Sequence, residues 1–385
     1  MRWTTKSYIA LLTPDGSLTI EDLALSDDAL LALPQARAVF LINAGAGRPY
    51  IARTSVLRRR ALRLLARREQ KSRLLNLRDT FTRLDYWLTG SALDAALQQY
   101  DLVRHHFPDD YLRVLRLRMP FYVKLLMANP WPRTMVTTHA GGNTSLVYGP
   151  FRSRVSAEAF ESGYLDLFQL RRCQEDLVPA PEHPGCIFGE MNKCSRPCQT
   201  AVGPDEYAQE VARATEFLRT GGRSLIRGIS AARDTLSAEM EFEEAARQHR
   251  RLEKVEEVLR LRDEIAGDLD HLNACAVARS ATENAADLFL LRDGHWQGRQ
   301  RISFELEDGK PVSIDHKLRG LFAATTSTKL SPVARREHLA ILARWFYSTW
   351  RDGELLVFEK FQDPPVRKLV NAIGRVMERN SALTG

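Results

Sequence analysis

The sequence predicts a multidomain α+β protein. The chain has 385 residues, and its 44% hydrophobic and 27% charged residues are typical of a globular protein with ample core. Segments of alternating apolar and polar residues are interleaved with segments of helical period. A stretch rich in cysteine, proline and glycine in the middle of the chain follows neither pattern. We therefore expect four units, covering residues 1–110, 111–203, 204–266 and 267–385.

The first unit is expected to be a small sheet with helices packed on it. The pair Asp15-Gly16 predicts the turn of a hairpin. Helices are expected to begin near Ser55 and Ser91, because serine is a favourable helix N-cap. The expected strands cover residues 7–20 (the hairpin), 37–43, 48–54 and 80–88.

The other three units combine short strands with long helices. A helix is expected to be capped near Ser156, and residues 171–200 are expected to lack regular structure. Pro204-Asp205 opens a helical stretch that runs to about Ile265, followed by a mixed α/β tail. One strand is expected to end at residue 150. The other expected strands lie at residues 121–126, 133–138, 272–277, 287–292 and 355–361.

Composition narrows the class of protein. There is no run of about 18 apolar residues that would span a bilayer, so no membrane association is expected. The first nine residues have no apolar core of a signal peptide, and five cysteines are too few and too clustered for a disulfide scaffold, since four of them lie close together in the sequence. We expect a cytoplasmic protein. Its net charge of +7 favours polyanionic partners.

Four of the five cysteines fall within 26 residues, in the stretch that has little apolar surface of its own. Thiolates that converge on a metal would cross-link such a loop. Spacing does not separate a zinc site from an iron-sulfur cluster, and His183 is a further candidate ligand for zinc. Cys275, on a predicted strand, is expected to be a buried core residue. The four clustered residues are Cys173, Cys186, Cys194 and Cys198.

A basic run follows the third predicted strand. Between Arg53 and Arg73 nine residues are Lys or Arg, and only Glu69 is acidic. Backbone phosphates of double-stranded DNA are the natural counter-charge for such a face, although a solvated helix surface is the alternative. The predicted DNA contacts are Arg58, Arg59, Arg63, Arg67, Arg68, Lys71 and Arg73.

Three segments resemble the UvrC family of bacterial nucleotide excision repair. They are Val147-Tyr148-Gly149-Pro150-Phe151, Leu170-Arg171-Arg172-Cys173 and Lys193-Cys194-Ser195-Arg196-Pro197-Cys198. The resemblance is good over residues 35–265 and weak beyond them. It implies that the four clustered cysteines hold a 4Fe-4S cluster, with zinc as the alternative. The family's second nuclease, of ribonuclease H type, and its helix-hairpin-helix modules are not found in this sequence, so at most one incision is expected.

The family begins with a GIY-YIG nuclease domain, and residues 35–108 resemble it in altered form. Ala38-Val39-Phe40 stands for Gly-Ile-Tyr, and Tyr50-Ile51-Ala52-Arg53 stands for Tyr-Ile-Gly-Lys. The resemblance implies that Tyr50, Arg53, Arg60 and Asp94 are catalytic and that Asp94 holds Mg²⁺ or Mn²⁺. Phe40 lacks a hydroxyl, and aspartate is one methylene shorter than the family's glutamate. The carboxylate oxygens of an aspartate therefore lie about one methylene length short of the glutamate position. A displacement of about 1 Å lowers the reaction rate on the order of a hundredfold.

Residues 236–252 resemble the family's UVR motif, which docks on the excinuclease B subunit. The resemblance implies that this partner binds through Phe242, Glu243, Ala245, Ala246 and Leu252. The alternative is an internal helical hairpin whose apolar stripe is ordinary core.

Together these features predict a UvrC-like repair endonuclease that makes a single-strand incision in damaged DNA. The alternative is a catalytically inactive DNA-binding adaptor that recruits the B subunit. A zinc-stabilised nucleic-acid module outside repair is a third, more remote reading.

Overall fold

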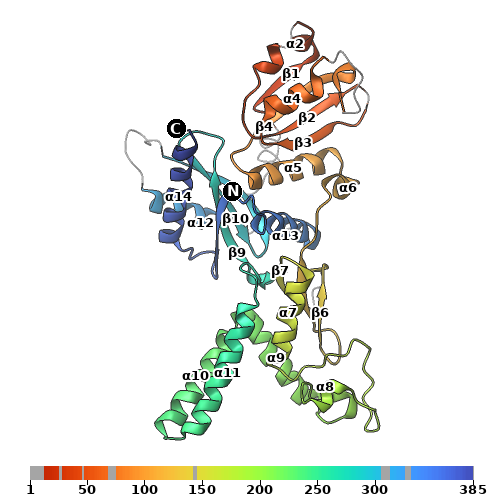
Figure 1. Cartoon of the computed structure of the whole chain (residues 1–385), viewed down its shortest axis with the longest axis vertical. Helices are drawn as coiled ribbons and strands as arrows, with labels where there is room; N and C mark the ends of the chain where they lie inside the picture. Colours follow the sequence, from red (N-terminus) through yellow and green to blue (C-terminus); the bar gives the residue numbers. More distant parts are fainter. Residues whose placement is uncertain are drawn as a thin grey trace.

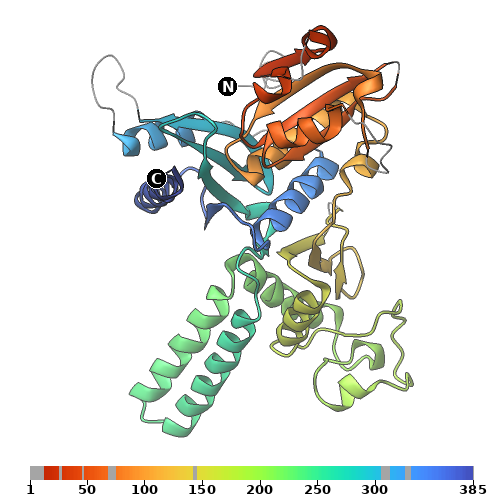
Figure 2. The same cartoon turned by 45° about the horizontal axis from the view of Figure 1, so that its top comes forward.

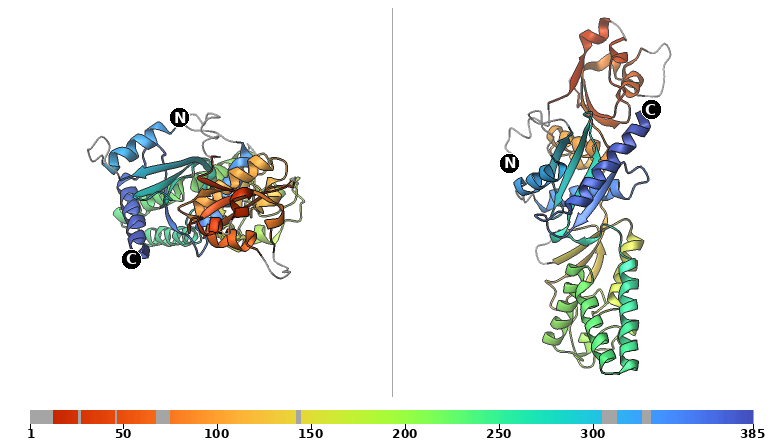
Figure 3. Two further views of the ribbon diagram at one scale, coloured as in Figure 1. Left: turned by 90° about the horizontal axis from the view of Figure 1, so that it is seen from above. Right: turned by 90° about the vertical axis from the view of Figure 1, so that its left-hand side faces the viewer.

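Three antiparallel sheets of four strands each organise the protein, a computed structural model of which describes residues 13–25, 28–45, 47–67, 75–141, 145–304, 313–325 and 331–384. The mixed α+β architecture is the one predicted. The chain folds back on itself, so that the C-terminal sheet and its helices lie between the N-terminal sheet and the middle of the chain (Figure 1; Figure 3, right). The two long helices of residues 223–260 extend away from the rest.

The N-terminal sheet has the strand order β1-β4-β2-β3, with β1 Gly16–Thr19, β2 Ala38–Ala44, β3 Tyr50–Thr54 and β4 Phe81–Leu88. The three strands predicted at 37–43, 48–54 and 80–88 are confirmed. The hairpin predicted over residues 7–20 falls partly outside the described residues. Its second strand, β1, pairs with β4 instead, with Gly16 opposite Tyr86. Two short helices follow β1, α2 Ile20–Leu25 and α3 Asp28–Leu31.

Helices cover both faces of this sheet (Figure 2). Helix α4 (Leu57–Leu65) packs on the face that carries Phe40, and α5 (Ala92–His106) packs on the face that carries Val39. Ser91 caps α5 as predicted, because its side chain accepts a hydrogen bond from Asp94 N at 3.1 Å. The cap predicted at Ser55 is wrong: Val56 is the N-cap of α4 and gives it no side-chain bond.

The middle sheet has the order β6-β5-β7-β8. Its strands are β5 Phe121–Leu126, β6 Thr134–Thr137, β7 Ser145–Phe151 and β8 Gly267–Asp268. Helix α6 (Tyr111–Leu115) precedes it, and α7 (Arg154–Leu165) packs on it. The cap predicted near Ser156 lies at Ser153; Ser156 is three residues further on and completes a reciprocal capping box.

Long helices follow the cysteine-containing segment. That segment contains only the short helix α8 (Ile187–Glu190) and a 3₁₀ turn at Pro197–Gln199, as its irregular composition predicted. Helix α9 (Pro204–Thr220) ends at Gly221 and Gly222, both with positive φ, and α10 (Arg223–Ala238) and α11 (Phe242–Arg260) form an antiparallel hairpin. None of the described helices is long and apolar enough to cross a membrane.

The C-terminal sheet has the order β11-β10-β9-β12, with strands β9 Asn273–Arg279, β10 Ala285–Arg292, β11 His295–Ser303 and β12 Gly353–Phe358. Helix α13 (Pro332–Phe346) covers one face, and α12 (Ile314–Ala324) and α14 (Val366–Thr384) cover the other. Cys275 is fully buried in β9, as expected. Sequence patterns missed β11, whose Gly298-Arg299-Gln300-Arg301 run carries no alternating signal.

Helix α5 joins the N-terminal sheet to the C-terminal sheet. The buried Glu337 of α13 accepts hydrogen bonds from the hydroxyls of Tyr100 at 2.6 Å and Tyr111 at 2.8 Å. Asp352, just before β12, accepts one from Ala92 N at 2.6 Å and pairs with Arg37 at 3.4 Å. Charge-assisted hydrogen bonds of this kind are about twice as strong as neutral ones, so they fix α5 against the C-terminal half.

Candidate functional site

Tyr50 and Arg60, two of the predicted catalytic residues, meet on one face of the N-terminal sheet. Tyr50 opens β3, and α4 crosses the sheet so that Arg60 Nη2 donates a hydrogen bond to Tyr50 Oη at 2.7 Å. The ring of Phe40 lies 6.0 Å from that of Tyr50. Arg60 Nε is buried and has no hydrogen-bond partner among the described residues. A phenol and a guanidinium held this way can together bind a phosphoryl oxygen.

Asp94 lies on the other side of the same sheet, in the first turn of α5. Its carboxylate accepts hydrogen bonds from Arg299 Nη1, at 3.0 Å to Oδ1 and 3.1 Å to Oδ2, and from Gly90 N at 3.2 Å. It is 3% exposed, and burial raises its pKa to about 6 although Arg299 acts in the opposite sense. Two donors therefore already occupy the carboxylate that was predicted to hold a divalent cation.

Arg53 shares the α5 face. Because side chains alternate along a strand, Ile51 and Arg53 point away from the face that carries Tyr50. Arg53 lines a narrow pocket against α5 and α13 together with Gln99 and Arg344. The four predicted catalytic residues are thus divided two and two between opposite faces of the sheet.

The basic run divides into exposed and structural arginines. Arg59 and Arg63 on α4 and Arg67 just after it are exposed. Arg58 is half-buried, and its Nε donates to Leu33 O at 2.7 Å, which ties α4 to the loop between α3 and β2. The predicted contacts Arg68, Lys71 and Arg73 lie outside the described residues. A basic surface of three exposed arginines therefore follows α4.

The four clustered cysteines are free thiols in one loop. Cys194 and Cys198 are buried, Cys173 is half-buried, and Cys186 at the start of α8 is exposed. Burial is the largest of the effects that raise the pKa of Cys194 to about 11, and the charges of the other three thiols act in the same direction. Cys194 therefore lies within the electrostatic influence of the other three.

Hydrogen-bond donors point at two of these sulfurs. Arg196 N donates to Cys194 Sγ at 3.4 Å, and the buried Arg171 donates through Nη1 to Cys173 Sγ at 3.3 Å. Such N–H donors orient and stabilise ligating thiolates, so the donor set fits a soft metal or an iron-sulfur cluster. In the described ranges, however, no three His, Cys, Asp or Glu side chains are grouped closely enough to hold a metal ion. The four sulfurs thus lie in one loop but do not form a coordination shell in the described structure.

The tip of the α10–α11 hairpin exposes apolar side chains. Phe242 is 65% exposed, and Met240 beside it is also exposed in a turn with positive φ. Glu243 and Ala246 are exposed on the same end of α11. Ala245 is buried, and Leu252 packs against the middle core. The predicted partner residues therefore divide into a solvent-facing group at the tip and two residues with internal contacts.

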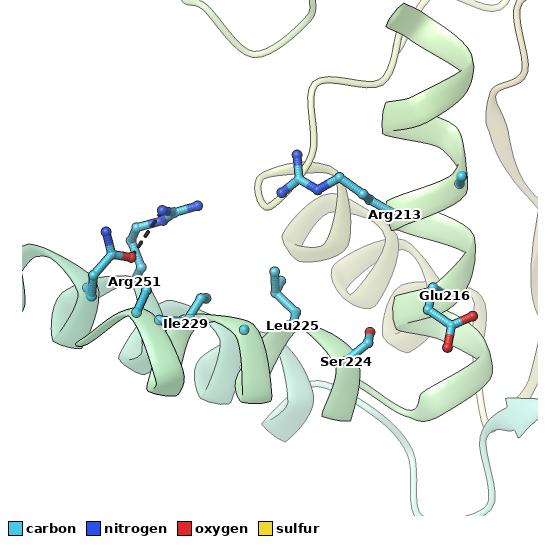
Figure 4. A pocket seen from close by; sticks show the side chains of 10 residues that line it. Arg213, Glu216, Ser224, Leu225, Ile229 and Arg251 are labelled. Atoms are coloured by element: carbon cyan, nitrogen blue, oxygen red, sulfur yellow. Dashed lines mark hydrogen bonds between the residues drawn. The ribbon is translucent and has the colours of Figure 1, made fainter. Parts of the chain in front are cut away.

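An open groove lies between α9 and this hairpin (Figure 4). It has a volume of about 570 Å³. Leu225 and Ile229 of α10 line it, with Arg213 of α9 on one side and Arg251 of α11 on the other. The groove is wide enough for side chains of a second helix and combines an apolar floor with a basic edge.

Comparison with known protein families gives a match in the middle of the chain. The model of the UvrC/Cho excinuclease middle domain matches residues 121–217, which include strands β5, β6 and β7 of the middle sheet, all four clustered cysteines and most of α9. Curated proteins named UvrABC system protein C match over longer stretches. The chain is similar to the UvrC family over most of its length, at low identity.

The individual likenesses are low in identity but long. The UvrABC system protein C of Lachnospira eligens is 22% identical over 270 residues, which cover 69% of this chain and 44% of that protein. The protein of Moorella thermoacetica is 23% identical, covering 74% and 46%. That of Dehalococcoides mccartyi is 22% identical over 357 residues, covering 89% and 57%. This chain thus spans about half the length of these UvrC relatives, and no solved structure matches it.

Sequence reasoning missed the residues that the C-terminal half brings to the N-terminal unit. Arg299, which pairs with Asp94, is 205 positions away from it. Arg344 and Trp350 line the pocket around Arg53 but belong to a segment for which no role was predicted. Only the unusual excess of arginine over acid near Arg299 and Arg301 could have drawn attention to that strand.

Proposed function

We propose that this UvrC relative is a DNA-repair adaptor of the excinuclease system: it binds duplex DNA through its basic α4 surface and recruits the excinuclease B subunit through the tip of the α10–α11 hairpin. The observation that carries the proposal is the pairing of Asp94 with Arg299. Hydrolysis at a phosphate would need that carboxylate near the phosphoryl group, yet it lies across the sheet from Tyr50 and Arg60 and already accepts hydrogen bonds from Arg299 and Gly90.

A metal-dependent endonuclease is the second candidate. It is supported by the 2.7 Å hydrogen bond between Arg60 and Tyr50, which keeps a cation and a phenol together at the surface reached by α4. In that case Tyr50 and Arg60 act at the phosphate, Arg53 takes no part because it lies on the opposite face of the sheet, and a divalent cation requires a carboxylate other than Asp94 in its present pairing.

A nicking and binding assay separates the two candidates. The protein is incubated with lesion-bearing duplex DNA, the B subunit and Mg²⁺ or Mn²⁺. We expect binding without a metal-dependent nick, and at least a tenfold loss of duplex affinity in Arg59→Ala/Arg63→Ala, because each arginine lost removes a phosphate contact. A metal-dependent nick that disappears in Arg60→Ala would establish the endonuclease instead.

Loss of the exposed ring at the hairpin tip is expected to weaken B-subunit binding. Phe242→Ala should raise the dissociation constant about 10- to 30-fold, since a buried aromatic anchor is a common hot spot. Stability should not change, because Phe242 is exposed in the isolated protein. Isothermal titration against the B subunit measures this. Val155→Ala, which removes an equally exposed apolar side chain on α7, is the control and should bind like the parent.

We also propose that Cys173, Cys186, Cys194 and Cys198 hold a 4Fe-4S cluster, with zinc as the alternative. The thiolate neighbourhood and its N–H donors support this ligand set. The cluster or zinc ion would cross-link a loop that otherwise has few apolar contacts. Its positive charge would offset the negative charges of the four thiolates.

Metal content tests the cysteine proposal. Cys194→Ser is expected to lose most of the bound metal, and with it the broad visible absorbance if the metal is iron. Elemental analysis after anaerobic purification distinguishes iron from zinc. Cys275→Ala removes the thiol of β9 and should keep the parent's metal content. Equal metal in Cys194→Ser and the parent would rule out the four-cysteine site.

A further inference from the structure

A small pocket lies where the N-terminal and C-terminal halves meet. It has a volume of about 30 Å³. Arg53 of β3 and Gln99 of α5 line it from one half, and Arg344 of α13 and Trp350 line it from the other. Side chains such as Ile341 form an apolar floor. The space suits one small oxygen-rich group rather than a whole nucleotide.

The charge around this pocket is not balanced by the protein. Arg53 is half-buried, and burial followed by the positive charges of Arg344 and Arg37 lowers its pKa. Within the described part of the chain the side chains of Arg53 and Arg344 form no ion pair or hydrogen bond. Crowding guanidinium groups without a counter-ion is unfavourable unless an anion binds there.

Asp352 is the carboxylate that pairs with Arg37, and it is already engaged. It pairs with Arg37 at 3.4 Å, accepts a hydrogen bond from Ala92 N at 2.6 Å and another from Trp345 Nε1 at 3.2 Å. It therefore neutralises at most part of the charge of the arginines around the pocket. Arg344, which lines the pocket, is exposed and can reach a ligand from solvent.

An aromatic surface adjoins the charged groups. Trp350, which lies in the turn after α13, is 49% exposed although it is a large apolar side chain. Guanidinium groups bind phosphate oxygens in bidentate fashion, and an exposed indole stacks on any base that is not paired. Bases within a duplex are already stacked and cannot reach such a ring.

We propose that this pocket is a binding site for single-stranded nucleic acid: Arg53 and Arg344 hold a backbone phosphate, and the neighbouring base stacks on Trp350. The inference rests on the proposed DNA-binding function and adds a second surface to it. The α4 surface binds duplex, whereas the pocket between the halves binds an unpaired segment. A protein with both surfaces would recognise a junction between paired and unpaired DNA.

Fluorescence anisotropy with labelled single-stranded oligothymidine and with a blunt duplex of equal length tests the site. Trp350→Ala is expected to lower affinity for the single strand about tenfold and to leave duplex affinity unchanged, and Trp350→Phe should retain most of the binding. Arg344→Ala should reduce the slope of log affinity against log salt by about 0.7 on the single strand. Arg344 and Trp350 are exposed, so neither variant should unfold the protein.

Two controls separate this inference from the proposed function. Arg319→Ala removes an exposed arginine of α12 that is paired with Asp315, and it should bind both probes like the parent. Arg59→Ala/Arg63→Ala should weaken duplex binding only. Unchanged single-strand binding in Trp350→Ala and Arg344→Ala, or an equal loss on both probes, would overturn the pocket while leaving the α4 surface intact. If only the Arg59→Ala/Arg63→Ala expectation fails, so that this variant binds duplex DNA like the parent, the result counts against the proposed function and not against the pocket.

Discussion

Arg299→Ala is expected to lower the free energy of unfolding at pH 7 by about 3 kcal/mol. The substitution leaves the Asp94 carboxylate buried without its charged partner, and removing one member of a buried pair typically costs about 3 to 5 kcal/mol. Arg299 keeps part of its side chain in solvent, which favours the lower end of that range. Urea denaturation followed by circular dichroism measures the change.

Two variants show that the loss comes from the pair. Arg299→Ala/Asp94→Asn removes the unpaired charge as well and should recover part of the lost stability. Arg319→Ala breaks an exposed pair at 2.8 Å on α12 and should cost about 1 kcal/mol or less. If Arg299→Ala were as stable as Arg319→Ala, the buried pair would make no contribution to the free energy of unfolding beyond that of an exposed pair.

The same pair sets a pH dependence. The pKa of Asp94 is raised from 3.8 to about 6, so between these values the folded protein binds a proton that the unfolded chain has released. Stability therefore falls as pH rises through this window, by about 3 kcal/mol for two pKa units. Burial also raises the pKa of Asp101 to about 7, so the parent contains a second contribution. The difference between parent and Asp94→Asn isolates Asp94, and identical slopes in the two proteins would contradict its assignment.

Local sequence patterns were sufficient to predict strands β2, β3 and β4 of the N-terminal sheet and the helix cap at Ser91. These features depend on neighbours within a few residues, on alternation in β2, β3 and β4 and on one serine side chain. The contact between Tyr50 and Arg60 is also local, since they are ten positions apart on consecutive elements. The hydrogen bond brings two of the four residues implied by the resemblance together, and their catalytic role stays a prediction.

The remaining geometry depends on contacts between distant parts of the chain. Glu337 stands in a run of charged residues at the start of α13 and looks like a surface residue in the sequence, yet it is fully buried under Tyr100 and Tyr111. Asp94 looks like a helix-dipole partner or a metal ligand, and only the register of β11 reveals its partnership with Arg299. No periodicity encodes such pairs, because each requires two separately folded sheets to meet.

Gly90 lies directly against the backbone at the end of β9, and its replacement by alanine is expected to be among the most damaging single changes. A Cβ at Gly90 would lie 2.0 Å from Arg279 O and 2.4 Å from Ser280 C, both backbone atoms of the C-terminal sheet. Backbone cannot yield as a flexible side chain does, so the halves must separate. We expect a loss of about 3 kcal/mol or more in the free energy of unfolding.

The damage in Gly90→Ala should be confined to the junction between the halves, which distinguishes it from general unfolding. Amide hydrogen exchange should accelerate in α5 and α13, where Tyr100 and Glu337 meet, and remain as in the parent in the α10–α11 hairpin. Gly320→Ala is the matched control: its new methyl group meets nothing within 4 Å on α12, and it should stabilise that helix by about 0.5 to 1 kcal/mol. Because Arg53 and Arg344 reach the small pocket from opposite sides of this junction, Gly90→Ala should also lose single-strand binding while it retains the duplex-binding surface of α4. A Gly90→Ala protein with parental stability and exchange would mean that the two halves are not held at this contact.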